Sequence, residues 1–253
     1  MNRAARWAAS LAASLAVGCA ALTPASAPHP NRYSLEGAAA EAARVPAPGA
    51  APTLVVSPPE AAAGFDSQRI LYVRKAHTLE YFAQNEWVDT PARMLAPLIV
   101  AATARSGAFS AVVLTPSIAS GQLRLDTQVR RLQHEFLENP SRVRFTLRAT
   151  LLDTATREVV AARDFEAVAT APSEDPYGGV VAANQAVRSV LESLAEFCAE
   201  AARNWRPRPA PGARAIEGAL QSADLPSVIA FRASSSSPAS ASGSSRGTTA
   251  VGS

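Results

Sequence analysis

The stretch RVRFTLRATL, residues 142–151, decides the fold because its side chains alternate strictly between polar and apolar. A period of two places every second side chain on the same face of a β-strand. One face of this strand is therefore expected in the core and the other in water, which is typical of an antiparallel sheet. The apolar members are Val143, Phe145, Leu147, Ala149 and Leu151.

The preceding segment predicts a second long strand that contains an irregularity. Residues 123–129 alternate in the same way, the phase slips at Arg130 and Arg131, and apolar residues return from Leu132 onward. One extra residue in a strand shifts the alternation and is accommodated as a β-bulge. The sequence therefore predicts a bulge at this pair of arginines.

Two helices are expected beside these strands. Thr90-Pro91 predicts the start of the first, and Asp175-Pro176 predicts the start of a longer one, because Thr and Asp cap helices and proline is tolerated in the first turn. The first helix is expected to bury Met94, Leu95, Leu98, Ala101 and Ala102. The second is expected to bury Val180, Val187, Leu191, Leu194, Cys198 and Ala201.

Shorter strands complete the expected fold. They are expected over residues 53–56, 69–74 and 79–82, with a hairpin strand over 159–167 after the turn at 153–156. The fold class is α+β: a mixed, mainly antiparallel sheet with two helices packed on one face.

Composition divides the 253-residue chain into four regions. Residues 1–18 have the pattern of a signal peptide, and residues 19–52 form an Ala/Pro-rich linker in which 32–35 are a candidate short strand. Residues 53–205 carry the periodic patterns and form the expected domain. Residues 206–253 are rich in Pro and Ser and are expected to be disordered.

Cys19 stands directly after the export signal. Arg3 and Arg6 precede an uncharged apolar run over residues 7–17, and Gly18 follows it. A membrane-spanning helix needs about 20 apolar residues, so this run is too short to be one. The arrangement resembles a bacterial lipobox, whose cysteine receives a diacylglyceryl group and becomes the mature N-terminus.

The alternative is an ordinary secretory signal, cleaved near Ala21 or Ala25, with Cys19 there by chance. Ala16 stands where the lipobox pattern prefers a branched aliphatic residue. Lipidation is favoured because one of only two cysteines in the chain falls at this position. Two or more acyl chains, such as diacylglycerol and palmitate, hold a protein firmly on a bilayer. No Asp follows Cys19, which favours the periplasmic face of the outer membrane.

Charge and cysteine content exclude several classes of protein. The formal net charge of +3 falls to +1 when residues 1–18 are removed, because Arg3 and Arg6 leave with them. The sequence pI of about 9.2 is therefore no argument for nucleic-acid binding. Acylation of Cys19 leaves Cys198 without a partner, so no disulfide is expected.

The sequence carries no recognisable catalytic or metal-binding motif. Its three histidines, His29, His77 and His134, have no second ligand at metal-site spacing. Gly178-Gly179 lacks the Lys and Ser or Thr of a phosphate loop and is expected to permit close packing. We therefore expect no enzyme activity, no metal and no cofactor.

An arginine stripe on the polar face of the central strand has two readings. It is either a docking surface for an acidic partner or lipid head groups, or a solvated face that is neutralised by the next strand. The second reading is favoured. The arginines are Arg142, Arg144 and Arg148, and the expected partners are Glu158, Asp164 and Glu166.

Four segments together resemble one family. DSQRI at 66–70 and NEWVDTP at 85–91 are the most specific, and 107–113 and 182–186 support them. Over about residues 33–205 the chain resembles the ABC-type transport auxiliary lipoprotein family, the PqiC-like group. The resemblance implies a domain similar to the amino-terminal domain of TolB, with no catalytic residues. It also implies a component of a lipid transport system whose periplasmic subunit carries mammalian-cell-entry (MCE) domains.

The expected function is non-catalytic tethering of an MCE-associated transport assembly to the outer membrane. Tyr81, Phe82 and Trp87 are the candidate partner contacts, with filling of the core as their alternative. An exposed strand edge also offers a way for copies of the chain to pair into a homo-oligomer.

Two other functions stay open at this point. One is a lipid-binding module with a cavity lined by Val143, Phe145 and Leu147. The other is a purely structural envelope lipoprotein.

Overall fold

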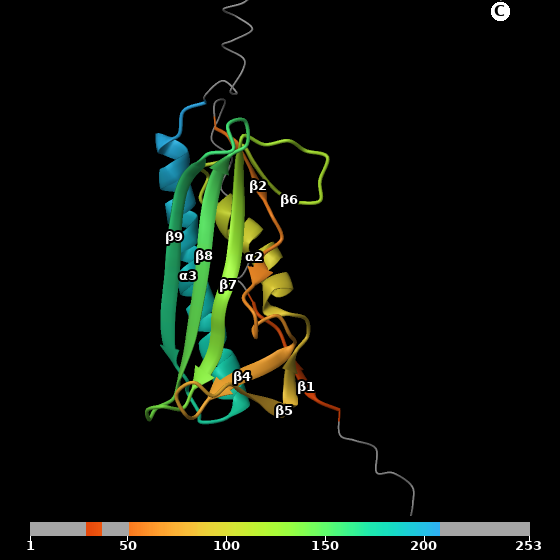
Figure 1. Ribbon diagram of the computed structural model, residues 1–253, viewed down its shortest axis with the longest axis vertical. Coiled ribbons are helices and arrows are strands. Elements are labelled where there is room, and N and C mark those ends of the chain that lie inside the picture. The colour runs from red at the N-terminus through yellow and green to blue at the C-terminus, as the bar shows by residue number, and fades with distance from the viewer. Residues whose placement is uncertain (1–28, 37–50, 208–253) are drawn as a thin grey trace, which may run out of the picture. The chain divides into compact units, whose positions relative to one another are not determined.

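The computed structural model describes residues 29–36 and 51–207, which form one sheet covered by two helices (Figure 1). Residues 1–28, 37–50 and 208–253 lie outside the described part, and with them Cys19, the signal region, much of the expected linker and nearly all of the expected tail. The strands are β1 (Asn31–Tyr33), β2 (Thr53–Val56), β3 (Glu60–Ala61), β4 (Arg69–Val73), β5 (Glu80–Trp87), β6 (Ala111–Leu114), β7 (Leu123–Glu135), β8 (Arg142–Asp153) and β9 (Val159–Thr170), and the helices are α2 (Pro91–Arg105) and α3 (Pro176–Asn204).

Strand β7 is the centre of the sheet because both of its edges are used. One edge pairs with β8 in antiparallel register from Leu123↔Asp153 to Glu135↔Arg142. The other edge is shared by three short parallel strands: β2 near its start, β3 in the middle and β4 near its end. The two ends of β7 therefore carry different neighbours, with β2 and β6 at one end and β4, β5 and β1 at the other (Figure 1).

The expected bulge is confirmed. The register between β7 and β8 shifts between Val129 and Arg131, so that Arg130 is the extra residue. Both arginines are exposed, while Val129 before them and Leu132 after them are buried. The bulge thus keeps the apolar residues of both halves of β7 on the side of the helices.

Both helices lie on one face of the sheet, as expected (Figure 1). Helix α3 packs on β8 and β9, and α2 packs against α3 and β6. Asp175 caps α3 by accepting a 2.7 Å hydrogen bond from the backbone N–H of Gly178. Thr90 occupies the N-cap position of α2, but its side chain makes no capping hydrogen bond.

The apolar stripe of α2 differs from the expected one. Leu95 and Ala102 are buried as expected, whereas Met94 and Leu98 are only half-buried and Ala101 is exposed. Residues that the sequence pattern left out complete the buried face, because α2 packs against both α3 and the sheet. They are Pro91, Ala92, Ala96, Ile99 and Thr103.

The core lies between the sheet and the helices. The apolar members of the 142–151 stretch are all at most 2% exposed, which confirms their alternation. They pack with the apolar face of α3, where Val187, Leu191, Leu194 and Cys198 are buried. The fold class is therefore α+β as predicted, while the likeness to TolB stays a prediction.

The folded part begins earlier than residue 53. The candidate strand near residues 32–35 is present as β1, which pairs in parallel with β5. The side chain of Asn184 on α3 bonds the backbone of Ser34 and Glu36, at 3.3 and 2.6 Å. This segment, which falls inside the expected linker, is thus fixed to both the sheet and a helix.

Candidate functional site

The three aromatic residues expected to contact a partner lie on β5 but in different environments. Trp87 is 3% exposed and belongs to the core, which favours the core alternative for this residue. Phe82 is half-buried, with its ring centroid 4.4 Å from that of Tyr72. Tyr81 is 48% exposed, and the guanidinium of Arg69 lies 4.0 Å from its ring centroid. Among the three, Tyr81 offers the largest exposed fraction to a partner.

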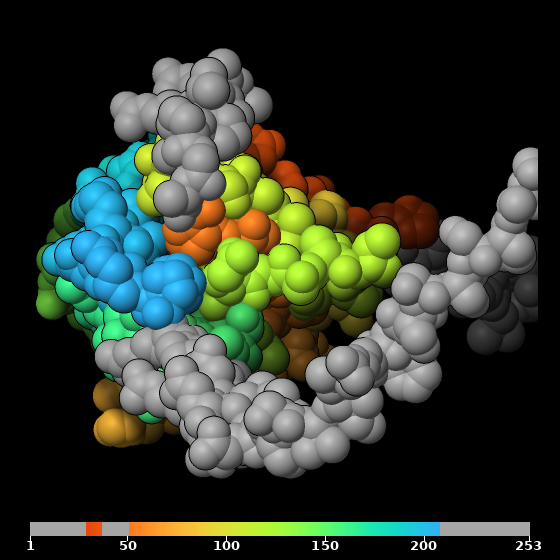
Figure 2. Space-filling view, turned by 90° about the horizontal axis from the view of Figure 1, so that it is seen from above, coloured from red at the N-terminus to blue at the C-terminus, as the bar shows by residue number. Residues whose placement is uncertain are grey.

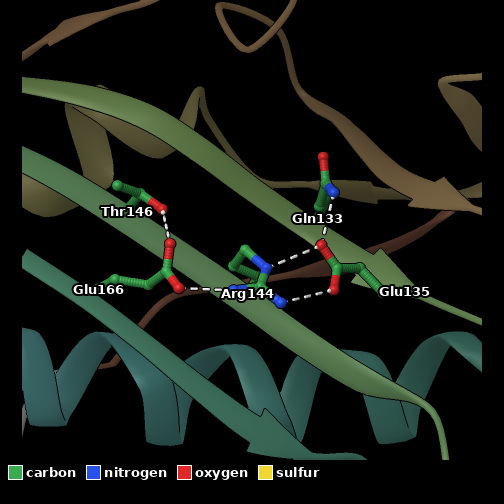
Figure 3. Close-up of polar contacts among 5 residues, drawn as sticks. All are labelled: Gln133, Glu135, Arg144, Thr146 and Glu166. Carbon is green, nitrogen blue, oxygen red and sulfur yellow. Dashed lines mark hydrogen bonds and ion pairs between the residues drawn. The ribbon is translucent and has the colours of Figure 1, made fainter. Parts of the chain in front are cut away.

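The arginine stripe is organised around Arg144, which lies between acidic residues of both neighbouring strands (Figure 3). Its guanidinium donates to both carboxylate oxygens of Glu135 on β7, at 3.0 and 3.3 Å, and also to Glu166 on β9. These hydrogen bonds, led by the one to Glu135, raise the pKa of Arg144, so the residue stays charged. Gln133 and Thr146 extend the network by donating to Glu135 and Glu166.

The other arginines of the stripe also have carboxylate neighbours. Arg148 lies 3.8 Å from Asp164, and Arg142 pairs with Glu138 in the turn after β7. These contacts favour the solvated, neutralised face over a docking surface. Asp164 and Glu166 were expected as partners from the sequence, whereas Glu135 and Glu138 were not, although the alternation that resumes after the bulge points to Glu135.

A buried polar cluster joins the sheet to the start of α3. The imidazole Nε2 of His134 and the hydroxyl of Ser141 are 2.8 Å apart, and Glu174 accepts a 2.8 Å hydrogen bond from the backbone N–H of Ser141. Burial lowers the pKa of His134, although Glu174 and Asp175 act in the opposite direction. The hydrogen bond from the Ser141 backbone lowers the pKa of Glu174.

This serine–histidine pair was not recognised in the sequence, and its setting is structural. Ser141 and His134 are at most 2% exposed, and Nδ1 of His134 has no hydrogen-bond partner among the described residues. A nucleophilic pair needs an accessible hydroxyl and a group that orients the second ring nitrogen. The cluster provides neither. The described residues also contain no group of three or more potential metal ligands.

Gly179 explains why the start of α3 approaches His134 so closely. A Cβ atom at this position would lie 2.5 Å from Nδ1 of His134, which is too close for any real contact. The expectation that Gly178-Gly179 permits close packing is therefore confirmed. The two glycines therefore have a packing role, and they do not form a phosphate-binding loop.

The surface hollows found among the described residues do not match the lipid cavity that one alternative function placed beside β8. A surface hollow of about 490 Å³ lies between the start of β9 and the end of α3, lined in part by Val160, Phe197 and Trp205. The hollow that touches Val143 measures only about 10 Å³, roughly one water molecule. Phe145 and Leu147 are fully buried. A lipid-binding module needed a cavity lined by Val143, Phe145 and Leu147, and these residues are instead closely packed.

No helix among the described residues is long and apolar enough to cross a membrane. Cys19 lies outside the described residues, so its lipidation stays a prediction.

The fold and the surface define an α+β domain with a packed core and a neutralised polar face. Its family follows from comparison: residues 33–195 match the family of the ABC-type transport auxiliary lipoprotein component, and the chain belongs to this family. The family description names a transport component rather than an enzyme, and membership in a lipoprotein family indicates association with the cell envelope. Among curated proteins, no sequence matches the chain.

Two solved structures share the fold, and a third shows a weaker likeness. A Xanthomonas campestris protein of the DUF330 family is 24% identical with a TM-score of 0.60, covering 69% of this chain and 97% of its own. An uncharacterized protein is 13% identical with a TM-score of 0.54, covering 68% and 99%. PelC from Paraburkholderia phytofirmans, which forms a dodecamer, is 16% identical with a TM-score of 0.34, covering 56% and 85%.

Proposed function

We propose that this chain is a lipid-anchored, non-catalytic adaptor that tethers an MCE-associated ABC-type lipid transport assembly to the periplasmic face of the outer membrane. The observation that carries the proposal is the family match over residues 33–195 together with a cysteine directly after an export signal. The packed core and the buried serine–histidine pair support a binding role over a catalytic one.

The fold shortens the tether that the sequence suggested. Because β1 is paired with β5, the chain between Cys19 and the folded part comprises only residues 20–30. At full extension this segment spans about 40 Å. With Cys19 acylated, the start of β1 therefore lies no more than about 40 Å from the bilayer surface.

Partner contacts are proposed at the exposed part of β5, with Tyr81 as the main candidate, beside Phe82, and with Arg69 stacked on the Tyr81 ring. Trp87 contributes indirectly, by fixing β5 to the core. Self-association through a strand edge stays part of the proposal, since β9 pairs only with β8 among the described strands.

The test combines lipid labelling with co-purification. Wild-type protein is expected to incorporate radiolabelled palmitate and to fractionate with the outer membrane, while Cys19→Ser does neither. Detergent-solubilised wild type is expected to recover an MCE-domain protein. Equal labelling of both forms would refute the anchor, and a complex without any MCE-domain protein would leave a purely structural lipoprotein.

A further inference from the structure

Helix α3 rests on the sheet in two ways. From Val187 to Cys198 its buried side chains are apolar and pack with the apolar face of β8 and β9. Its first turn lies instead over the imidazole of His134, at the end of β7 that pairs with β4 (Figure 1). The other end of the helix, blue in Figure 2, reaches the surface at the opposite end of the domain. The joint with an ionisable group is therefore at the start of α3.

The two ring nitrogens of His134 are held differently. Nε2 lies 2.8 Å from the hydroxyl of Ser141. Nδ1 is buried and finds no hydrogen-bond partner in residues 29–36 and 51–207. It faces Gly179, where a Cβ atom would lie only 2.5 Å away. An imidazolium carries an N–H donor on both nitrogens, so protonation would leave a buried donor on Nδ1 without an acceptor.

The start of α3 also makes a positive charge on this ring unfavourable. The N–H groups of a first helical turn carry partial positive charge, so a helix N-terminus favours anions over cations. The carboxylate of Asp175 accepts from the N–H of Gly178, at 2.7 Å, and Gly179 follows in the same turn. A protonated His134 would thus lie against the end of the helix that repels it.

Two carboxylates act in the opposite direction. Glu174 and Asp175, directly before α3, attract a proton to His134, but both are exposed to solvent, which weakens the attraction. Burial outweighs them and lowers the pKa of His134. Both carboxylates have pKa values below their ordinary ones because backbone N–H groups donate to them, so they stay charged at about pH 5.

The strands beside the ring give it an aromatic and apolar setting. The side chains that they place next to it are Tyr72 on β4, Phe82 on β5 and Val143 on β8. Burial raises the pKa of the tyrosine above its ordinary value of 10.0, so its hydroxyl is neutral in the same pH range. Glu135, next to His134 in β7, points to the other face of the sheet and pairs with Arg144 (Figure 3). In the turn after β7, Glu138 pairs with Arg142.

Ser141 connects the ring to both the turn between β7 and β8 and the start of α3. Its backbone N–H donates to Glu174, at 2.8 Å, and its carbonyl accepts from the N–H of Ala171, at 2.9 Å. Phe136, in the same turn, lies with its ring centroid 4.1 Å from that of His134. Displacement of the imidazole therefore loosens this turn and the first turn of α3, while the apolar contacts of the rest of the helix remain.

We infer that His134, Ser141 and the first turn of α3 form an acid-sensitive latch, closed while the imidazole is neutral and opened locally when the imidazole takes a proton from solvent. On opening, the ring leaves Gly179 and Ser141, and both of its N–H groups gain water as acceptor. Parts of a fold that open at a lower free energy than the whole molecule are common. The inference depends on neither the anchor nor the partner proposed above.

Hydrogen–deuterium exchange of the full chain tests the latch at about pH 5 and about pH 7.5, corrected for the intrinsic exchange rates. At the lower pH the opening equilibrium of residues 136–142 and 174–183 is expected to rise at least about threefold and at most about thirtyfold. The upper limit follows because opening takes up one proton at a group whose pKa is about 6.5 when exposed. Residues 187–198 are expected to stay at least about tenfold better protected at both pH values.

His134→Gln separates the latch from a general effect of acid. Its amide keeps a group that can bond Ser141 but does not titrate, so the difference between the two pH values is expected to disappear. His77→Gln, at an exposed position, is the matched control and is expected to keep the wild-type difference. A difference that persists in His134→Gln refutes the role of this residue.

The wild type alone also decides the question, even if His134→Gln does not fold. Equal protection of residues 174–183 and 187–198 at about pH 5 would mean that acid acts only through global unfolding, and no latch exists. An opening equilibrium that is the same at both pH values would overturn the inference as well. A rise confined to the start of α3 and the turn before β8 supports it.

Discussion

The indole Nε1 of Trp205 donates a 2.8 Å hydrogen bond to the carboxylate of buried Asp153, joining the end of α3 to the turn between β8 and β9. The other oxygen of this carboxylate accepts from the backbone N–H groups of Ala155 and Thr156 in that turn. Trp205, the C-cap residue of α3, thus joins the end of this helix to the end of the sheet where β2 and β6 lie.

Replacing Trp205 with Phe is expected to lower the free energy of unfolding by about 1–3 kcal/mol, because a buried carboxylate loses a donor while most of the ring remains. Urea unfolding measures this change. Tyr177→Phe is the control, since Tyr177 is 62% exposed on the same helix, and we expect a change within about 0.5 kcal/mol. Equal effects of the two substitutions would contradict the assignment.

Gly179→Ala is expected to destabilise the fold by about 1–3 kcal/mol. This is the reverse of the usual effect, since alanine is normally about 1 kcal/mol more favourable than glycine inside a helix. The added Cβ meets the His134 ring, which is held in the core. Denaturation of the single variants and of Gly179→Ala with His134→Ala gives the coupling between the two sites. A smaller loss for Gly179→Ala in the His134→Ala background supports the clash. Ser189→Ala, on the exposed side of α3, is expected to be nearly neutral.

Acid is expected to weaken the fold through His134. Burial lowers the pKa of His134 below its ordinary value of 6.5, so the unfolded chain binds the proton more readily than the folded one. Stability is therefore complete above about pH 6.5 and falls as the pH drops below that value. Glu174 and Asp175 have lowered pKa values, so their contributions are lost further down, below about pH 4.5.

The measurement is the free energy of unfolding between pH 5 and 8, values chosen to span the ordinary histidine range of about 6.5. His134→Gln is expected to flatten this dependence, whereas His77→Gln, at an exposed position, is expected to retain it. Identical slopes for His134→Gln and wild type would show that His134 does not control the effect.

Arg144→Ala is expected to cost about 1–2 kcal/mol, because Glu135 is mostly buried and loses both hydrogen bonds from the guanidinium. Arg142→Ala is the matched control: its side chain and that of Glu138 are 47% and 66% exposed. For this exposed pair we expect less than about 0.5 kcal/mol. Urea midpoints at low and high salt measure both, and equal losses would contradict the central place of Arg144 in the network.

The thiol of Cys198 is expected to be inert in the folded protein. Burial raises its pKa to about 12, so almost no thiolate forms at pH 8. In the Cys19→Ser chain Cys198 is the only cysteine, and a disulfide-exchange reagent is expected to react with it only after denaturation. Rapid reaction of the native chain would show that α3 opens near this residue.

The strands that follow a simple local period were predictable, and the arrangement of the short ones was not. Alternation over residues 142–151 and the phase slip at Arg130 and Arg131 identified β8 and the β7 bulge. No local signal shows that β2, β3 and β4 share one edge of β7, because that pairing depends on connections distant in the chain.

The candidate contacts show the same limit. Tyr81 and Trp87 look equivalent as aromatic residues of one segment, yet one is exposed and one is buried. The register between β4 and β5 shifts between the pairs Arg69↔Glu86 and Leu71↔Tyr81, so alternation alone does not give the outward face of β5. His134 and Ser141 are brought together by the turn between two long strands, which no short motif records.

The bulge in β7 also determines how the gene for this protein can vary. Loss of the single codon for Arg130 would remove the extra residue, and Arg131 and Leu132 would still face Thr146 and Phe145, now in a regular ladder. Loss of one codon within the regular part of β8, such as that for Arg148, would instead turn the side chains on one side of the deletion to the opposite face of the sheet. A lost codon is therefore expected to be tolerated far better at the bulge than within β8.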